Sequence, residues 1–559
     1  MQQMMKEKLR IGILLNSHII PSWEFRIVKV ITDSEYAEIV LVILNNPVLP
    51  KVQKKRNPQA PGLLRLLDKT DRIIFSRKID YDLKKDVYDL LRDIPYLELE
   101  TGLEESSANI SGQEVDGIQK YSLDIILKFG SFSINSDILK KAKYGIMSYS
   151  VDNQKVLNEI KPGFWEVVRK IDVTNSALVI SNGDAEQEAL IFSSWESTCP
   201  FSINLNRNIV HWRNALFMPR IVKGIYKNGK HFLDRQKDKF NSLAGNTEMN
   251  PLPASFYTSS WDILNYCTNS VRTIYRKLFY TDDFNWQLLF NIHQGDDGLL
   301  PDFSKFTKIS SPKGTFWADP FIVAEDDSYY VFVEEYIYKK HKAHISVLKL
   351  DNKGTLLRSD KIIERQYHMS YPFVFKLDDV YYMIPETSKN KTIELYWSTD
   401  FPYKWEFERN LMENISAVDT TLFLFNKKWW LFTSVDQTGN ISGNSTELFL
   451  FFTDNIFSGK WESHPDNPIV SDVRRARPAG KLFIHDDIIY RPSQDCSGRY
   501  GKAFNINQVT KLTETEYSET LHTKIEPVWD KKLAGIHTFN FDKDFTVIDV
   551  YSFRKRIGV

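Results

Sequence analysis

The chain has 559 residues, with 72 Lys and Arg against 72 Asp and Glu, and therefore carries no formal net charge. This balance argues against a protein whose main task is to neutralise nucleic-acid phosphates, because that task requires a basic excess. The hydrophobic share of 42% indicates a folded chain, and 36 Phe, 26 Tyr and 13 Trp favour β-structure and a flat ligand such as a sugar ring.

The N-terminal part, residues 1–213, alternates apolar runs with helical spacing. The runs typical of buried strands are residues 11–15, 38–44 and 123–129. Residues 21–32 and 136–143 have helical spacing, and Pro21 stands where helices often begin. Strands that alternate with helices in this way predict a doubly wound α/β domain with a parallel sheet.

Residues 214–284 contain lysine-rich helical patterns and polar loops, which predict a helical connector. A cationic amphipathic helix is also typical of a membrane-surface segment, so peripheral membrane contact stays open. No apolar run is long enough to span a bilayer, and the charged N-terminus leads directly into a strand. We therefore expect a cytoplasmic protein without a transmembrane segment, of undetermined oligomeric state.

The cysteines give no sign of a metal centre or a disulfide framework. Cys199, Cys267 and Cys496 are far apart, odd in number and in no Cys-x-x-Cys pattern. The sequence therefore predicts no metal.

Residues 285–559 are rich in short aromatic strands that form a recurring hairpin, as in 323–333, 375–383, 424–432 and 482–490. A short polar phrase accompanies each repeat: residues 318–320, 370–372, 418–420, 477–479 and 535–538. The marker residues Asp319, Tyr371, Asp419, Arg477 and His537 are spaced by 52, 48, 58 and 60 residues. Repeats of this length, each sufficient for a four-stranded sheet, predict a five-bladed β-propeller.

In a propeller the innermost strands begin at one end of a central channel, so the marker residues should converge there. Asp319, Asp419 and Glu386 are the candidate catalytic carboxylates, because paired carboxylates perform acid–base work at glycosidic bonds. The candidate substrate-binding residues are Trp317, Glu335, Arg477, Asp495 and His537. The alternative is that these residues are turn formers and stabilising ion pairs at the strand entries.

The phrases also resemble a known family. Residues 316–321, 370–374, 384–388, 418–421, 477–480 and 535–538 are similar to the N-terminal domain of glucosamine inositolphosphorylceramide transferases, and through it to the arabinanase and levansucrase propellers. The resemblance implies a catalytic role for Asp319. In the glycosidase relatives the acid Glu lies in the fourth blade, where this chain has Arg475 and Arg477, so the resemblance favours sugar binding or transfer over hydrolysis.

The N-terminal part resembles the formyltransferase fold in residues 123–130, 138–143, 145–150 and 162–166. That family's Asn-x-His falls on Ser148 and Ser150, and its later Asp matches Asp184. A serine hydroxyl is not basic near neutral pH, so Ser150 cannot replace the histidine base. The resemblance thus implies a degenerate site, and 10-formyltetrahydrofolate would be a cofactor only if this domain were active.

Three functions follow. The first is a carbohydrate-active protein of bacterial surface-glycan or glycolipid biosynthesis, a transferase in preference to a hydrolase, which takes a sugar, nucleotide-sugar or glycolipid in the propeller channel. The second is a formyltransferase that acts on an amino sugar. The third is a non-catalytic scaffold that binds glycan.

Overall fold

The computed structural model of the chain describes residues 6–47, 69–75, 80–101, 107–108, 117–130, 133–134, 142–150, 163–181, 188–246, 260–293, 299–439, 441 and 443–555. Contacts divide the chain into two compact units, Met1–Ser194 with Thr198–Ser270 and Trp195–Ser197 with Val271–Val559. Within the described parts of the chain, no helix is both long enough and apolar enough to cross a membrane.

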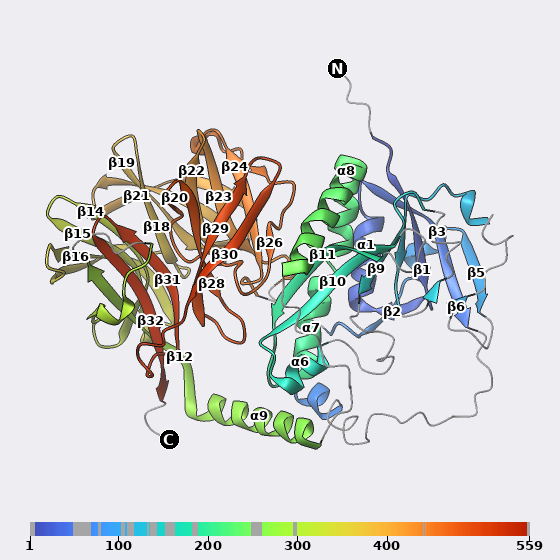
Figure 1. Cartoon of the computed structure of the whole chain (residues 1–559), viewed down its shortest axis with the longest axis horizontal. Coiled ribbons are helices and arrows are strands. Elements are labelled where there is room, and N and C mark those ends of the chain that lie inside the picture. Colours follow the sequence, from blue (N-terminus) through green and yellow to red (C-terminus); the bar gives the residue numbers. More distant parts are fainter. Residues whose placement is uncertain are drawn as a thin grey trace. The chain divides into compact units, whose positions relative to one another are not determined.

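The first unit is built on a seven-stranded sheet of order β11-β10-β9-β7-β1-β3-β5 (Figure 1). The strands are β1 (Leu9–Leu15), β3 (Ala37–Pro47), β5 (Tyr96–Thr101), β7 (Ile125–Lys128), β9 (Ile146–Ser150), β10 (Val173–Ser181) and β11 (Glu188–Ser197). Strands β5, β3, β1, β7 and β9 are parallel in this order, and β10 runs antiparallel to β9. The three predicted strands and their parallel pairing are confirmed.

Helix α1 (Ser22–Thr32) follows β1, with Pro21 at its N-cap, and packs on β3. Its buried face includes Ile27, Val28 and Ile31, as the helical spacing predicts. Most of the helix predicted at 136–143 lies outside the described residues, and so do stretches of the connection from β7 to β9. The doubly wound, formyltransferase-like assignment therefore stays a prediction.

The smaller elements of the unit flank this sheet. They are the strands β2 (Ile19–Pro21), β4 (Lys84–Asp86), β6 (Ser107–Ala108) and β8 (Ser133–Ile134), and the helices α3 (Tyr88–Leu91), α6 (Phe164–Arg169) and α7 (Ile203–Asn214). Strand β2 pairs with β4, and β6 pairs with β8.

The predicted connector, residues 214–284, differs from the observed division. It contains α8 (Phe217–Asn246) and α9 (Ser260–Phe279). Helix α8 contacts α1 and β3 and buries Phe217, Met218 and Val222, so it belongs to the first unit. The apolar stripe that the sequence shows at 215–226 thus packs against the helix and sheet of its own unit.

The second unit is a propeller of five sheets, as the repeat predicts. Three blades have consecutive strands: β14 (Thr315–Glu325) to β17 (Leu356–Ile363), β18 (Ser370–Leu377) to β21 (Lys404–Glu413), and β27 (Phe483–His485) to β30 (Tyr517–Ile525). Their other strands are β15 (Ser328–Ile337), β16 (Lys342–Asp351), β19 (Val380–Thr387), β20 (Thr392–Asp400), β28 (Ile488–Asp495) and β29 (Ala503–Leu512). A further blade contains β22 (Ala417–Phe425), β23 (Lys428–Val435), β24 (Glu447–Thr453) and β25 (Glu462–Ser463), with β26 (Val470–Ser471) on β24.

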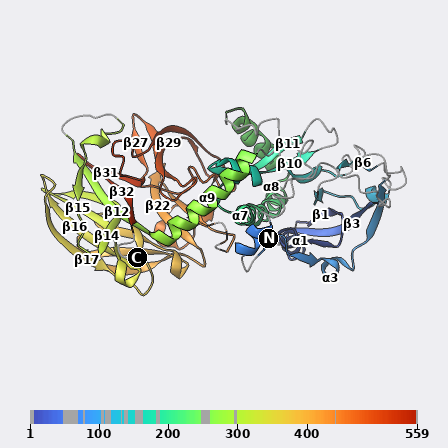
Figure 2. The ribbon, with the colours of Figure 1, turned by 90° about the horizontal axis from the view of Figure 1, so that it is seen from below.

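The remaining blade closes the ring. Its order is β13-β12-β32-β31, formed by β12 (Tyr280–Ile292) and β13 (Thr307–Ile309) with β31 (Gly535–Asp542) and β32 (Phe545–Lys555). Figure 2 shows β12, β31 and β32 together on this side of the propeller. The fifth polar phrase, residues 535–538, is followed by only part of a repeat, because β12 and β13 of its sheet come from the beginning of the propeller.

The aromatic residues mostly fill the spaces between the sheets. Tyr329 and Trp430 are buried in two of the core clusters, and Tyr381 packs against a third. The aromatic surplus is therefore largely architecture, because aromatic side chains supply much buried area in a β-structure.

Candidate functional site in the propeller channel

Three of the five polar phrases share a backbone feature. Asp319, Tyr371 and Asp419 have φ values of 50°, 44° and 53°, in the left-handed region. The register of each innermost strand shifts there, between Ala318 and Phe321, Ser370 and Phe373, and Val418 and Thr421. A left-handed non-glycine residue costs on the order of 1 kcal/mol, and such bulges often re-aim a side chain beside a functional site.

One half of the site is a buried ion pair. The Arg477 guanidinium donates to both carboxylate oxygens of Asp419, with Nε–Oδ2 at 2.6 Å and Nη2–Oδ1 at 3.3 Å. Gln494 Nε2 donates to the same Oδ2 at 2.9 Å. Asp419 is 1% exposed, so this bidentate arrangement compensates a carboxylate that is almost fully buried.

Glu386 faces this ion pair. Its Oε2 lies 3.8 Å from Arg477 Nη2. Burial first, and then the Asp419 carboxylate, raise the pKa of Glu386 from 4.5 to about 8, against the opposing effect of Arg477. A carboxyl group with this pKa exchanges protons near neutral pH, as acid–base catalysis requires.

The other half of the site is a chain of three side chains. His537 Nε2 lies 3.2 Å from Asp319 Oδ1, and His537 Nδ1 lies 2.6 Å from Asp549 Oδ1. The Asp319 backbone N–H donates to Asp549 Oδ2 at 2.8 Å. Burial, followed by the negative charges of Glu334 and Asp419, raises the pKa of Asp319 well above 3.8.

Aromatic rings hold both halves in place. Trp286 stacks on His537 with 3.9 Å between ring centroids and 20° between planes. Tyr371 joins three blades, because its N–H donates to Asp319 Oδ2 at 3.2 Å and its hydroxyl accepts from the Gly480 N–H at 2.8 Å. The site is thus a preorganised network rather than a set of independent turn residues.

The second half also offers a donor set for a cation. One ligand atom from each of Asp319, His537 and Asp549 lies within 4.8 Å of the others. Both ring nitrogens of His537 already face a carboxylate oxygen, so the three side chains satisfy one another without an ion.

Three predicted site residues lie elsewhere. Glu335 accepts from Ser346 Oγ at 2.6 Å and lies 3.3 Å from His344 Nε2, whereas its neighbour Glu334 is the one that influences Asp319. Asp495 pairs with Lys524 at 2.8 Å. Trp317 is 1% exposed in a core cluster.

Strand alternation explains which residue of a neighbouring pair lies in the cluster. Successive side chains of a strand point to opposite faces, so Gln494 faces Asp419 while Asp495 faces away. The polar phrases gave no signal for Asp549, because it lies on β32, the second strand of the closing blade, and each phrase marks only the first strand of its blade. The structure therefore joins Asp319, Glu386, Asp419, Arg477 and His537 and adds Glu334, Gln494 and Asp549.

The degenerate formyltransferase site stays a prediction. Ser148 and Ser150 lie on β9, in register with Val179 and Ala177 of β10. Asp184 lies outside the described residues.

Comparison with known proteins supports the resemblance of the propeller. Residues 304–547 match the family model described as glucosamine inositolphosphorylceramide transferase 1, N-terminal. The chain is 36% identical over 207 residues to glucosamine inositolphosphorylceramide transferase 1 of Oryza sativa subsp. japonica, covering 36% of this chain and 27% of the relative. The Arabidopsis thaliana protein of the same name is 31% identical over 238 residues, covering 41% and 31%. The chain thus spans less than a third of either relative.

Two solved structures are also similar. Zg3597, a family 117 glycoside hydrolase of Zobellia galactanivorans, matches with a TM-score of 0.32 and 8% identity, over 48% of this chain and 91% of that one. An exo-1,5-alpha-L-arabinanase from a bovine ruminal metagenomic library matches with a TM-score of 0.30 and 15% identity, over 43% and 94%.

Proposed function

We propose that the chain is a glycosyl-type transferase, or the sugar-binding component of one, and that its propeller channel holds the sugar. The proposal extends to bacterial surface-glycan or glycolipid assembly as its setting. The observation that carries the proposal is that two clusters of charged side chains lie together in the propeller. In one, Arg477 contacts Asp419 and Glu386. In the other, His537 lies between Asp319 and Asp549. Carboxylates and a guanidinium that lie together suit the hydroxyl groups of a sugar.

The residues divide the work of such a transfer. The acceptor hydroxyl forms a bond to the anomeric carbon, the bond from that carbon to the leaving group breaks, and the hydroxyl proton passes to a base. Glu386, with a pKa of about 8, is ionised in a fraction of the molecules near neutral pH and accepts that proton in this form, while the leaving group departs with the electron pair of the broken bond. Arg477 and Gln494 hold Asp419 in one orientation, so that its free lone pairs accept sugar hydroxyls.

His537 fixes the orientation of Asp319. Its ring is held between two carboxylates and under Trp286, so that Asp319 presents a constant geometry to a ligand. The names of the relatives supply the sugar with which to begin, glucosamine.

The test is calorimetric binding of glucosamine and of a panel of nucleotide-sugars, followed by assays of transfer with each ligand that binds. We expect Asp319→Asn, Asp419→Asn and Glu386→Gln each to weaken binding at least about tenfold, because each alters a hydrogen bond to a charged group. The matched control is Asp379→Asn, at a hairpin tip where the carboxylate is 98% exposed.

Glu386→Gln separates binding from chemistry, because it keeps the shape of the side chain and removes its proton exchange. Binding with no transfer to any acceptor would favour the glycan-binding scaffold over the transferase. Unchanged affinity in all three channel variants would remove the channel from the function.

A further inference from the structure

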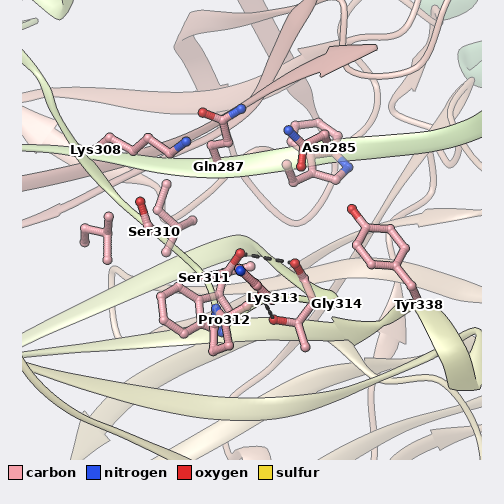
Figure 3. A pocket seen from close by; sticks show the side chains of 14 residues that line it. Asn285, Gln287, Lys308, Ser310, Ser311, Pro312, Lys313, Gly314 and Tyr338 are labelled. Atoms are coloured by element: carbon pink, nitrogen blue, oxygen red, sulfur yellow. Dashed lines mark hydrogen bonds between the residues drawn. The ribbon is translucent and has the colours of Figure 1, made fainter. Parts of the chain in front are cut away.

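A second cavity lies in the propeller, apart from the acidic side chains of the channel. Its volume is about 570 Å³, within the range of small-molecule sites. Its wall comes from β12, from the loop between β13 and β14, and from Tyr338 after β15. Figure 3 shows Asn285 and Gln287 on one side of this cavity and the loop from Ser311 to Gly314 on the other.

The charge of the cavity is opposite to that of the channel. Its lining residues include Lys308 and Lys313 and no Asp or Glu. Both lysines are exposed, and within the described part of the chain neither has an acidic partner at ion-pair distance. Two ammonium groups that no carboxylate neutralises favour an anionic ligand.

Neutral hydrogen-bonding groups surround the two lysines. The hydroxyls of Ser310 and Ser311 and the amides of Asn285 and Gln287 lie in the wall. These groups donate to phosphate oxygens and also bind the hydroxyls of a polyol.

The loop of the cavity is held in shape by its own bonds. Ser311 Oγ donates to the Thr315 carbonyl at 3.2 Å, and Thr315 Oγ1 donates to the Pro312 carbonyl at 3.0 Å. Gly314 has a φ of 87°, and a Cβ there would meet nothing within 4 Å. The left-handed turn needs glycine, and the open space beside it belongs to the cavity.

An aromatic residue links this cavity to the channel. Trp286 lines the cavity and stacks on His537, whose ring contacts Asp319. Trp286 is only 4% exposed, so little of its ring is open to the cavity, and the half-buried Tyr338 supplies the accessible aromatic surface.

We propose that this cavity is a binding site for a phosphorylated sugar, with the phosphate at Lys308 and Lys313 and the sugar against Tyr338. Lysine binds phosphate as a point charge, and aromatic rings stack on the apolar face of a sugar. The same chemistry occurs in a free sugar phosphate and in a lipid with a phosphorylated polyol headgroup. The proposal uses residues other than those of the channel cluster and stands without the proposed function.

The experiment is calorimetric titration of the full chain with glucosamine 1-phosphate, with glucosamine and with inorganic phosphate. We expect the sugar phosphate to bind most tightly and to lose affinity as salt is raised. Lys308→Gln and Lys313→Gln should each raise its Kd at least about tenfold, because each removes a hydrogen bond to a charged group. The matched control is Lys339→Gln, which removes an exposed lysine next to Tyr338 that does not line the cavity.

A second arm distinguishes the two sources of the ligand. In this arm, vesicles with and without phosphatidylinositol are sedimented with the protein. Binding that needs the inositol lipid and both lysines assigns the site to a lipid headgroup. Binding of the soluble ester alone assigns it to a free sugar phosphate. Lysine variants that behave like Lys339→Gln, or no binding of either ester, would overturn the proposal. Asp419→Asn should leave this binding unchanged, so failure of the channel site and failure of this site are distinguishable.

Discussion

The sequence predicts a catalytic site in the propeller channel and a degenerate one on strand β9 of the first unit, and in the channel the described residues bring the predicted side chains into contact. In the channel, Asp419 and Arg477 meet although 58 residues separate them. On β9, Ser148 and Ser150 lie in register with β10, and Asp184 lies outside the described residues. Polar residues that repeat from blade to blade are predicted to converge in space, whereas a single degenerate motif predicts only the strand on which its residues lie.

The difference arises from closure of the ring. Each innermost strand begins at the same end of the channel, so one bulge repeated in successive blades places successive side chains together. In an open sheet the corresponding positions are spread along an edge, and loops must bring the partners together.

We expect the largest effect from a substitution that breaks the ion pair of the channel. Arg477→Ala leaves Asp419 buried without its cation, and we expect the free energy of unfolding to fall by about 3–5 kcal/mol. Ser148→Ala, at a half-buried position on β9, should change it by less than about 0.5 kcal/mol. Urea unfolding followed by circular dichroism measures both; equal effects would contradict the contrast between the two regions.

The next expectation concerns pH. The pKa of Glu386 is about 8 in the folded chain, against an ordinary value of 4.5, because burial and Asp419 oppose its ionisation. The folded state therefore holds this proton more tightly than the unfolded state, and the stability that follows is complete below pH 4.5 and is lost as pH rises through 8. Unfolding curves between pH 5 and about 9 should fall more steeply for the natural chain than for Glu386→Gln; parallel curves would show that Glu386 is not buried as described.

A smaller effect separates two neighbours on β28. Gln494→Ala removes one of the bonds that orient Asp419, and we expect glucosamine binding to weaken roughly three- to tenfold. Asp495→Asn affects only the contact with Lys524 and the adjacent turn, so its affinity should remain within about twofold of the natural chain. Calorimetry of both variants decides it, and the reverse order of effects would place the ligand on the other face of the strand.

The last prediction is that the first unit has no formyltransferase activity. Ser148 and Ser150 supply no general base, so the chain should not transfer a formyl group from 10-formyltetrahydrofolate to a 4-amino-sugar nucleotide. Chromatography of the sugar nucleotide after incubation checks this. Formylated product would show that the first unit is an active formyltransferase with a different base.

The repeat explains how much of this architecture can be predicted. Five phrases of the kind at Asp319 and Asp419 require one closed ring, so blade number and convergence follow from spacing alone. Spacing does not say which of two adjacent side chains points inward, and the pairs Glu334 with Glu335 and Gln494 with Asp495 depend on a register that only strand pairing fixes.

The place of Asp549 in the channel and the cavity lined by Lys308 and Lys313 could not be predicted from the sequence, for a further reason. Asp549 belongs to the closing sheet, in which β32 pairs with β12 from the other end of the propeller. The cavity depends on a loop whose shape comes from bonds of Ser311 and Thr315. Neither feature repeats, so no comparison within the chain reveals it.

The measurement that tests the central claim most directly is a crystal structure of the chain with glucosamine bound. We expect a sugar ring in the propeller channel, with hydroxyl groups within hydrogen-bond distance of the Asp419 or Asp319 carboxylate and with Glu386 beside the anomeric carbon. A sugar bound elsewhere, with the contacts of Asp419 to Arg477 and of Asp319 to His537 unchanged and no ligand against them, would contradict it.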